Sequence, residues 1–177
     1  MRANPSVSGP PVHAYPPLVT AVAVGIVLGA DALVPGLSVF FPGQRVLGAV
    51  VAILGVVLVV WTTGRFRAAR TTILPDRLDE RREEMTTLLT DGPFAWSRNP
   101  IYLGMALLVT GAGLGVGSLV APFVLAGFVW FIQTRQIVPE ERVMLERFGE
   151  RYADYAARTR RWFGRGALPK PEGGARA

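Results

Sequence analysis

Residues 99–134 read NPIYLGMALLVTGAGLGVGSLVAPFVLAGFVWFIQT and contain no Asp, Glu, Lys or Arg. A membrane-crossing helix needs about 20 apolar residues to span a hydrocarbon core of about 30 Å. The uncharged run is too long for one such helix and leaves little to spare for two. It therefore predicts a tight helical hairpin with its turn at residues 115–118. Small residues such as Gly111 and Gly113 are expected to let the two arms approach closely.

The composition of the whole chain supports a membrane location. Of its 177 residues, 50% are hydrophobic and only 18% are charged, and the mean hydropathy is +0.34. A soluble domain carries about 25% charged residues. The charged residues here are crowded into a few stretches between long apolar runs. These features are typical of an integral membrane protein.

Two more apolar runs precede the hairpin, at residues 18–34 and 46–63. With the hairpin they predict an all-α, polytopic membrane protein of four spans. The Pro- and Ser-rich residues 1–17 are expected to be a disordered leader, and residues 18–63 a two-span N-terminal hairpin. Residues 64–87 are expected to form a polar cytoplasmic linker. Residues 166–177 are expected to be a disordered tail.

The basic residues predict the orientation. Seven of them lie in residues 64–100 and ten in residues 135–177, while only Arg45 lies between the first two spans. Cytoplasmic loops carry the excess of Lys and Arg. Both termini and the central polar segment are therefore predicted to be cytoplasmic, in a multi-pass protein of a prokaryotic inner membrane. Because the basic residues flank apolar runs, they indicate a lipid bilayer as partner rather than a nucleic acid.

The segment after the hairpin predicts a cytoplasmic helix. Pro139 suits a first helical position, Glu140 and Glu141 suit the first turn, and Gly149 can end or hinge the helix. Beyond Gly149, aromatic and polar residues recur at helical spacing among several arginines: Tyr152, Tyr155, Thr159 and Trp162. This pattern predicts an amphipathic basic helix that lies on an anionic membrane surface.

Several kinds of chemistry are excluded by composition. The chain has no Cys and a single His, so disulfides, thiolate nucleophiles and Cys/His metal centres are not expected, and no metal is predicted. Asp31 lies inside the first apolar run and is a candidate functional residue. It is also near the end of that run, where a carboxylate can reach water.

Two clusters remain as candidates for chemistry. The first is LLTDGPFAWSRNPIYLG at residues 88–104, and the second is RQIVPEE at residues 135–141. Each has an ordinary explanation, because a basic flank with an Asn-Pro helix start, or acids at a helix N-terminus, is common at a membrane edge. The mixed charges at residues 79–84 are typical of a solvated linker.

The clusters say more when they are read in order. A Gly-Pro-Phe turn at 92–94 is followed by Arg-Asn-Pro-x-Tyr-x-Gly at 98–104 and the uncharged hairpin. Glu140-Glu141, Phe-Gly at 148–149, Tyr-x-x-Tyr at 152–155 and Arg-Arg at 160–161 come next. This series resembles the isoprenylcysteine carboxyl methyltransferase and phospholipid methyltransferase superfamily of integral membrane enzymes. The resemblance covers residues 88–163.

The resemblance implies a methyltransferase that uses S-adenosylmethionine and releases S-adenosylhomocysteine, with a donor-binding catalytic region at residues 88–165. The adenine is expected against Leu88, Leu89 and Phe94. The rest of the donor is expected against a set from the helix start and one acid, namely Arg98, Asn99, Pro100, Tyr102, Gly104 and Glu140. The residues expected to act in catalysis are Arg98, Asn99, Glu140 and Glu141. The acceptor is expected to meet Arg135, Gln136 and Glu141.

The chain departs from the superfamily pattern at two positions. The family often has His where this chain has Asn99, and Asn cannot act as a base at neutral pH. Prenylcysteine enzymes place an Arg at the position of Gln136, with Arg135 here beside it. The acceptor is expected to be lipophilic or membrane-partitioned, and a lipid amine, a carboxylate and a small thiol all remain open.

Two other functions remain as alternatives. A small membrane scaffold could use a basic tail only to hold anionic lipid. NADPH-dependent sterol reductases have a similar Arg-His-Pro-Asn-Tyr hairpin, but they usually place an acid soon after the Tyr. Leu103 and Gly104 follow Tyr102 here, which makes a reductase the lesser alternative.

Overall fold

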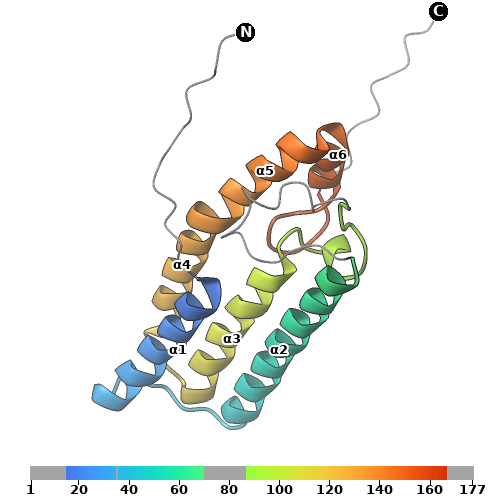
Figure 1. The fold of residues 1–177 in the computed structure, drawn as a ribbon. Coiled ribbons are helices and arrows are strands. Elements are labelled where there is room, and N and C mark those ends of the chain that lie inside the picture. Colours follow the sequence, from blue (N-terminus) through green and yellow to red (C-terminus); the bar gives the residue numbers. More distant parts are fainter. Residues whose placement is uncertain (1–14, 35, 70–86, 167–177) are drawn as a thin grey trace, which may run out of the picture.

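The computed structural model describes residues 15–34, 36–69 and 87–166, except for the side chain of Asp31. Residues 1–14 of the predicted leader 1–17, most of the predicted linker 64–87 and residues 167–177 of the predicted tail 166–177 lie outside this part. The end of the predicted leader is helical, because α1 begins at Pro16. The described residues form helices and two isolated β-bridges, and no strand. The α-helices are α1 Pro16–Leu33, α2 Gln44–Ala68, α3 Pro100–Val116, α4 Ala121–Ile132, α5 Val138–Phe148 and α6 Glu150–Arg158 (Figure 1). The predicted all-helical class is confirmed.

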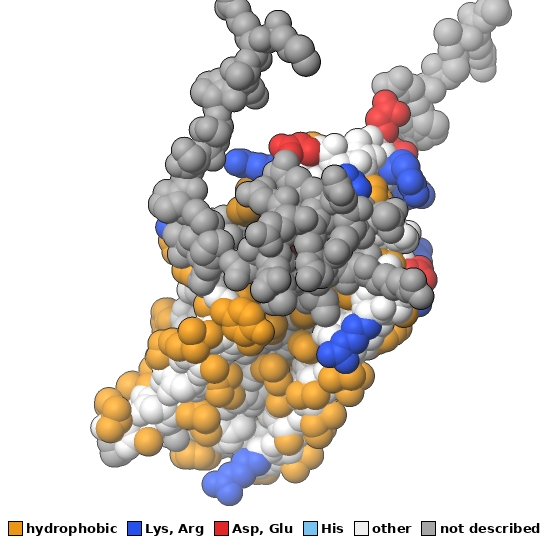
Figure 2. All heavy atoms as spheres, viewed as in Figure 1, with side chains coloured by type: hydrophobic (Ala, Val, Ile, Leu, Met, Phe, Trp, Pro, Cys, Tyr) orange, Lys and Arg blue, Asp and Glu red, His pale blue; other side chains and the backbone are white. Residues whose placement is uncertain are grey.

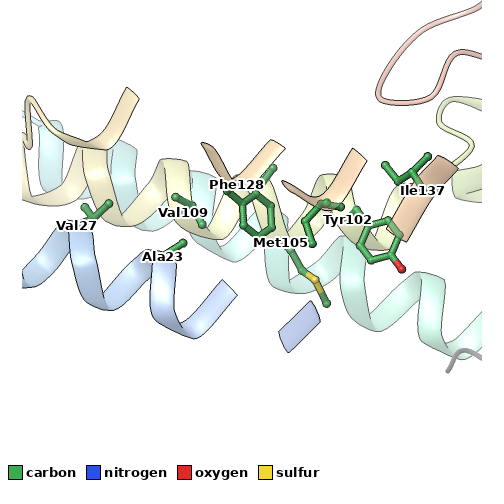
Figure 3. Packing of buried hydrophobic residues seen from close by; sticks show 9 residues of the cluster. Ala23, Val27, Tyr102, Met105, Val109, Phe128 and Ile137 are labelled. Carbon is green, nitrogen blue, oxygen red and sulfur yellow. The ribbon is translucent and has the colours of Figure 1, made fainter. Parts of the chain in front are cut away.

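Helix α3 is the centre of the bundle. It packs against α1, α2 and α4, and α1 also packs against α4 (Figure 1). The buried core runs along α3 and includes Met105 and Val109, which lie against Val27 of α1 and Phe128 of α4 (Figure 3). Tyr102 and Ile137 continue this row. Because α3 packs against α1, α2 and α4, its N-terminal end is held near α4 and the segment that follows α4.

Glycines bring α2 and α3 into direct backbone contact. A Cβ atom added at Gly48 would lie 2.6 Å from the Gly111 carbonyl oxygen, and one added at Gly111 would lie 2.7 Å from the Gly48 carbonyl oxygen. Such contacts are typical of closely packed membrane helices. Gly111 therefore packs against α2 and not, as expected, against the other arm of the hairpin. Gly113 does face that arm, because a Cβ there would overlap Ala121 of α4.

The predicted hairpin turns slightly later than expected. Helix α3 ends at Val116, and Gly117 closes it with a φ of 69°, a conformation that favours glycine. Helix α4 begins at Ala121. The turn is tied to the loop between α1 and α2, since Val39 N–H donates to the Gly117 carbonyl (2.9 Å) and Leu119 N–H donates to the Leu37 carbonyl (2.8 Å).

Helices α4 and α5 are one continuous rod, which corrects the prediction of a new helix at Pro139. A π-helical turn, Gln133–Ile137 (η3), joins them, and Val138 N–H donates to the Gln133 carbonyl five residues earlier. Proline lacks an N–H and its ring clashes with a carbonyl one turn earlier in a regular α-helix. The wider π turn just before Pro139 is a recognised way of relieving this conflict without ending the helix.

Two helices are long and apolar enough to cross a membrane, namely Gln44–Ala68 and Ala121–Phe148. Pro16–Ala30 and Pro100–Val116 are shorter apolar helices. Hydrophobic side chains cover much of the lower part of the face in Figure 2, and charged side chains gather mainly near α5 and α6. We call the end formed by residues 87–100 and 138–166 the polar end. Four spans stay a prediction.

The C-terminal segment differs from the amphipathic helix that was predicted. Helix α6 ends at Arg158, and Thr159 has an extended backbone. Tyr152 and Tyr155 are buried, with 7% and 5% of their surface exposed, and they pack in a cluster with Phe94. The aromatic face of α6 is thus covered by the protein itself. Residues 159–166, which we call the closing loop, fold back instead of continuing the helix, and a β-bridge joins Thr159 to Arg165.

Candidate active site

A cavity of about 90 Å³ lies at the polar end, between the start of α3 and α5. It is lined by residues from α2, the segment before α3, α3, α5 and α6. Most of the residues predicted to bind the donor are among them, namely Leu88, Leu89, Phe94, Arg98, Asn99, Pro100, Tyr102 and Glu140. Glu141, which was predicted to act in catalysis and to meet the acceptor, also lines the cavity. The chain brings them together because the hairpin returns α5 to the level at which α3 began.

The loop before α3 is fixed from two sides. Residues Gly92–Ala95 form a 3-10 turn (η2), in which Gly92 has a φ of 58°. The ring of Phe94 packs edge-on against Phe66 of α2, with centroids 5.3 Å apart, and the Tyr155 hydroxyl donates to the Phe94 carbonyl (2.7 Å). Arg65 of α2 also pairs with Asp91. One wall of the cavity is thus attached to both α2 and α6.

The first polar pair in the cavity joins the two arms of the hairpin. The Tyr102 hydroxyl, in the first turn of α3, donates to Glu140 Oε1 of α5 over 2.6 Å. Tyr102 is 5% exposed. No ion pair links Glu140 to any described basic residue. No described cation is therefore in place to compensate a negative charge on this carboxyl group.

The second polar group is a carboxylate between two arginines. Arg98 Nη2 lies 3.0 Å from Glu141 Oε1, and Arg161 Nη2 lies 2.7 Å from Glu141 Oε2. The Arg161 Nε–H also donates to Glu141 Oε2 (2.9 Å). The pairing raises the pKa of the Arg161 guanidinium. The two neighbouring acids therefore have different partners. Glu140 accepts a hydrogen bond from a phenol, and Glu141 is paired with two arginines.

Arg98 has a donor that is not used. Its side chain is 14% exposed, and its buried Nε atom has no hydrogen-bond partner among the described residues. A buried donor without a partner costs about 1–3 kcal/mol. An unpaired donor on the wall of a cavity is a position at which a ligand oxygen would be stabilised.

The closing loop holds this wall through main-chain bonds. Arg98 N–H donates to the Arg160 carbonyl (2.9 Å), and Gly164 N–H donates to the Trp96 carbonyl (2.8 Å). The Asn99 side-chain amide donates to the Arg161 carbonyl over 3.2 Å. Two segments more than sixty residues apart in the chain are therefore paired beside the cavity.

Sequence reasoning missed several residues of this site. Arg161, Tyr152 and Tyr155 were assigned to the two faces of a surface helix, but Arg161 binds Glu141 and both tyrosines line the cavity. Burial and the nearby Glu141 carboxylate raise the pKa of the Tyr152 phenol to about 12. Trp162 also points inward, since its Nε1–H donates to Gln133 Oε1 on the π turn (3.0 Å). Trp and Tyr in a basic segment are a weak signal for such burial.

Three predicted site residues do not line the cavity: Gly104, Arg135 and Gln136. Gly104 lies in the α2–α3 contact, where an added Cβ would be 2.8 Å from the Gly55 carbonyl oxygen. Arg135 and Gln136 belong to the π turn, where Arg135 is exposed and Gln136 is 5% exposed. Their predicted contacts with the acceptor remain predictions.

A comparison with known protein families covers most of the segment that forms this cavity. The family model for phospholipid methyltransferases matches residues 44–151, which is more than half of the chain. The chain belongs to this family. The matched residues of this phospholipid methyltransferase family member include the cavity residues from Phe66 of α2 to Met144 of α5. The match ends before Tyr152, Tyr155 and the closing loop.

Two curated relatives are similar to this family member. Protein-S-isoprenylcysteine O-methyltransferase of Schizosaccharomyces pombe is 28% identical over 75 residues, which are 42% of this chain and 32% of the relative. Protein-S-isoprenylcysteine O-methyltransferase B of Arabidopsis thaliana is 30% identical over 129 residues, which are 68% of this chain and 62% of the relative. The chain thus spans less than two thirds of either relative. No solved structure matches it.

Proposed function

We propose that this phospholipid methyltransferase family member is an integral membrane enzyme that transfers a methyl group from S-adenosylmethionine to a lipophilic acceptor. The observation that carries the proposal is the meeting of Arg98, Tyr102 and Glu140 in one cavity, from opposite ends of an apolar hairpin. The two curated relatives are named as O-methyltransferases, which supports the same class of reaction.

The cavity offers the groups that such a donor needs. The donor has a carboxylate, an ammonium group, a sulfonium and an adenine, which call for a cationic donor, an anion and an apolar surface. The unpaired Nε of Arg98 suits the carboxylate, and the uncompensated Glu140 suits the ammonium group. Leu88, Leu89 and Phe94 supply the apolar wall. When bound, S-adenosylmethionine supplies a methyl group activated by a sulfonium.

The contacts divide the predicted catalytic residues into two groups. Glu140 and Arg98 have free capacity toward a ligand, and Tyr102 orients Glu140. Glu141 and Asn99 are occupied by the closing loop, since Glu141 binds Arg161 and Asn99 donates to the Arg161 carbonyl. We therefore assign Glu141 and Asn99 to positioning Arg98, rather than to contact with the donor.

The volume of the cavity implies that binding changes its shape. Its volume of about 90 Å³ is smaller than the about 300–1,000 Å³ of ordinary ligand pockets. Half-buried apolar side chains such as Leu88 and Met144 line it. Side chains of this kind can change rotamer at low cost, so the donor would widen the cavity as it enters.

We further propose four spans, with the polar end and both termini in the cytoplasm. The two long apolar helices and the two shorter ones are candidates for these spans. The exposed arginines of α5, α6 and the closing loop all lie at the polar end, while Arg45 lies at the start of α2 at the opposite end. This asymmetry agrees with the rule that cytoplasmic segments are positive.

Calorimetry with S-adenosylhomocysteine on detergent-purified protein tests the proposed donor. We expect saturable binding with one site. Absence of binding at millimolar ligand would reject the methyltransferase and favour a lipid-binding scaffold. Where binding is found, incubation with a lipid extract and methyl-labelled donor would identify the acceptor.

A further inference from the structure

A second hollow lies on the outer side of Arg98. It has a volume of about 500 Å³ and is open to the surface. Its lining comes mostly from the closing loop and consists of Arg98, Ala156, Thr159, Arg160, Arg161, Trp162 and Phe163. Arg98 lines both this hollow and the donor cavity. A ligand in the hollow would therefore lie beside a ligand in the cavity.

The hollow has an excess of positive charge. Its charged lining residues are three arginines, and no described acid lines it. Glu141 lies behind them and binds both Arg98 and Arg161, which compensates one charge of the three. Arg160 has no ion pair with a described acid, and its side chain is exposed. Guanidinium groups bind phosphate and carboxylate oxygens through paired N–H donors.

The rest of the lining is apolar and aromatic. Trp162 packs against the central core, and Phe163 is 63% exposed and contacts Trp96, which is 64% exposed (centroids 6.4 Å apart). Exposed aromatic pairs of this kind are common at the level of lipid headgroups. The hollow thus places cationic and apolar surfaces side by side, as an amphiphilic ligand with an anionic head requires.

We propose that this hollow binds the anionic group of the acceptor, a phosphate or a carboxylate on an apolar chain, with Arg160 as its main free cation. The proposal rests on the proposed methyltransferase function, because it assigns the acceptor's place next to the donor. It assigns the acceptor's anion to this hollow and gives Arg160 the main part in holding it. Arg98 would then contact both ligands, since it lines both the cavity and the hollow.

Binding of simple amphiphiles tests the proposal. Dodecyl phosphate, laurate and uncharged dodecanol would be titrated into the protein in dodecyl maltoside, each with and without saturating S-adenosylhomocysteine. We expect the anionic probes to bind and dodecanol to bind at least tenfold more weakly. Tighter binding of dodecyl phosphate would indicate a lipid phosphate as the natural head, and tighter binding of laurate a carboxylate. The titrations without S-adenosylhomocysteine do not depend on the donor site. They would therefore still test the hollow if the protein did not bind S-adenosylhomocysteine.

Matched variants locate the binding. R160Q should weaken binding of the preferred anion about fivefold, as expected for loss of an exposed charge contact of about 1 kcal/mol. R160K should keep most of the affinity. R158Q removes the same charge from α6 outside the hollow and should change the affinity less than twofold. Equal losses in R160Q and R158Q, equal binding of dodecanol, or no binding of either anion would each overturn the proposal. Unchanged melting temperatures would show that the variants are folded.

Discussion

The Tyr102 hydroxyl lies 2.6 Å from Glu140 Oε1, although 38 residues separate the two in the chain. The bond closes the hairpin at its polar end, where α3 begins and the rod of α4 and α5 crosses above it. It joins a buried phenol to the one acid of the cavity that has no described cation beside it. The pair therefore serves both the fold and the proposed donor site.

Tyr102→Phe should weaken S-adenosylhomocysteine binding about tenfold or more. The ring would still fill its place in the core, but Glu140 would lose the donor that orients it, and a single hydrogen bond to a charged group contributes about 1.5–3 kcal/mol. Calorimetry measures the change. Tyr15→Phe, at an exposed position, is the control and should bind as the wild type does. Wild-type affinity in Tyr102→Phe would remove this bond from the site.

Glu140→Gln should weaken S-adenosylhomocysteine binding at least tenfold and change the melting temperature little. The substitution removes the charge that we assign to the donor's ammonium group and keeps the size of the side chain. Glu146→Gln, exposed further along α5, is the control. If Glu140→Gln bound normally, the acid would be part of the helix only, where a charge in the first turn contributes about 0.3–1 kcal/mol.

Glu141→Gln should act mainly on stability. It would leave Arg98 and Arg161 without their shared carboxylate, and Arg98 is only 14% exposed. We expect a loss of about 1.5–3 kcal/mol in the free energy of unfolding, measured by thermal or chemical denaturation in detergent. Donor affinity should fall less than in Glu140→Gln. The reverse order of the two affinities would exchange the roles assigned to the two acids.

Gly111→Ala should destabilise the α2–α3 contact by more than about 2 kcal/mol, because overpacking of this kind forces backbone shifts. The added Cβ would lie 2.6 Å from the Ala52 nitrogen, where no flexible side chain can give way. Gly127→Ala in α4 is the control, since a Cβ there meets nothing within 4 Å. A wild-type melting temperature in Gly111→Ala would show that α2 and α3 are further apart than described.

Single cysteines test the proposed four-span topology in this cysteine-free chain. Arg45→Cys and Arg158→Cys are both at exposed positions, one at the start of α2 and the other at the end of α6. In intact cells, an impermeant maleimide should label the first and not the second. Labelling of both from outside would contradict a cytoplasmic polar end.

Much of the fold followed from hydropathy, because long uncharged runs leave few alternatives to helices. The meeting of residues 88–102 with Glu140 and Glu141 followed from the hairpin, which returns the chain to its starting level. Two features, the π turn and the closing loop, could not be predicted from the sequence. Pro139 usually marks a helix start, so the π turn that carries the helix through it was not predicted.

The closing loop could not be predicted for another reason. Tyr152, Tyr155, Thr159 and Trp162 keep a helical spacing, although the helix ends at Arg158. What ends it is tertiary: Arg160 and Gly164 bond to the main chain beside Arg98, more than sixty residues away in sequence. Local spacing contains no information on such partners. The glycine at position 164 was the local sequence signal against a continued helix, and in the structure it has a φ of 106°.

The pairing of Trp96 and Arg98 with Gly164 and Arg160 also sets an order for biogenesis. The helices up to α5 precede the closing loop in the chain and can pack before that loop pairs with the segment before α3. Arg98 meanwhile lacks both its main-chain acceptor on Arg160 and the second arginine that shares Glu141. A chain truncated before residue 160 would thus lack the main-chain pairs and the second arginine that complete the wall of the proposed binding site.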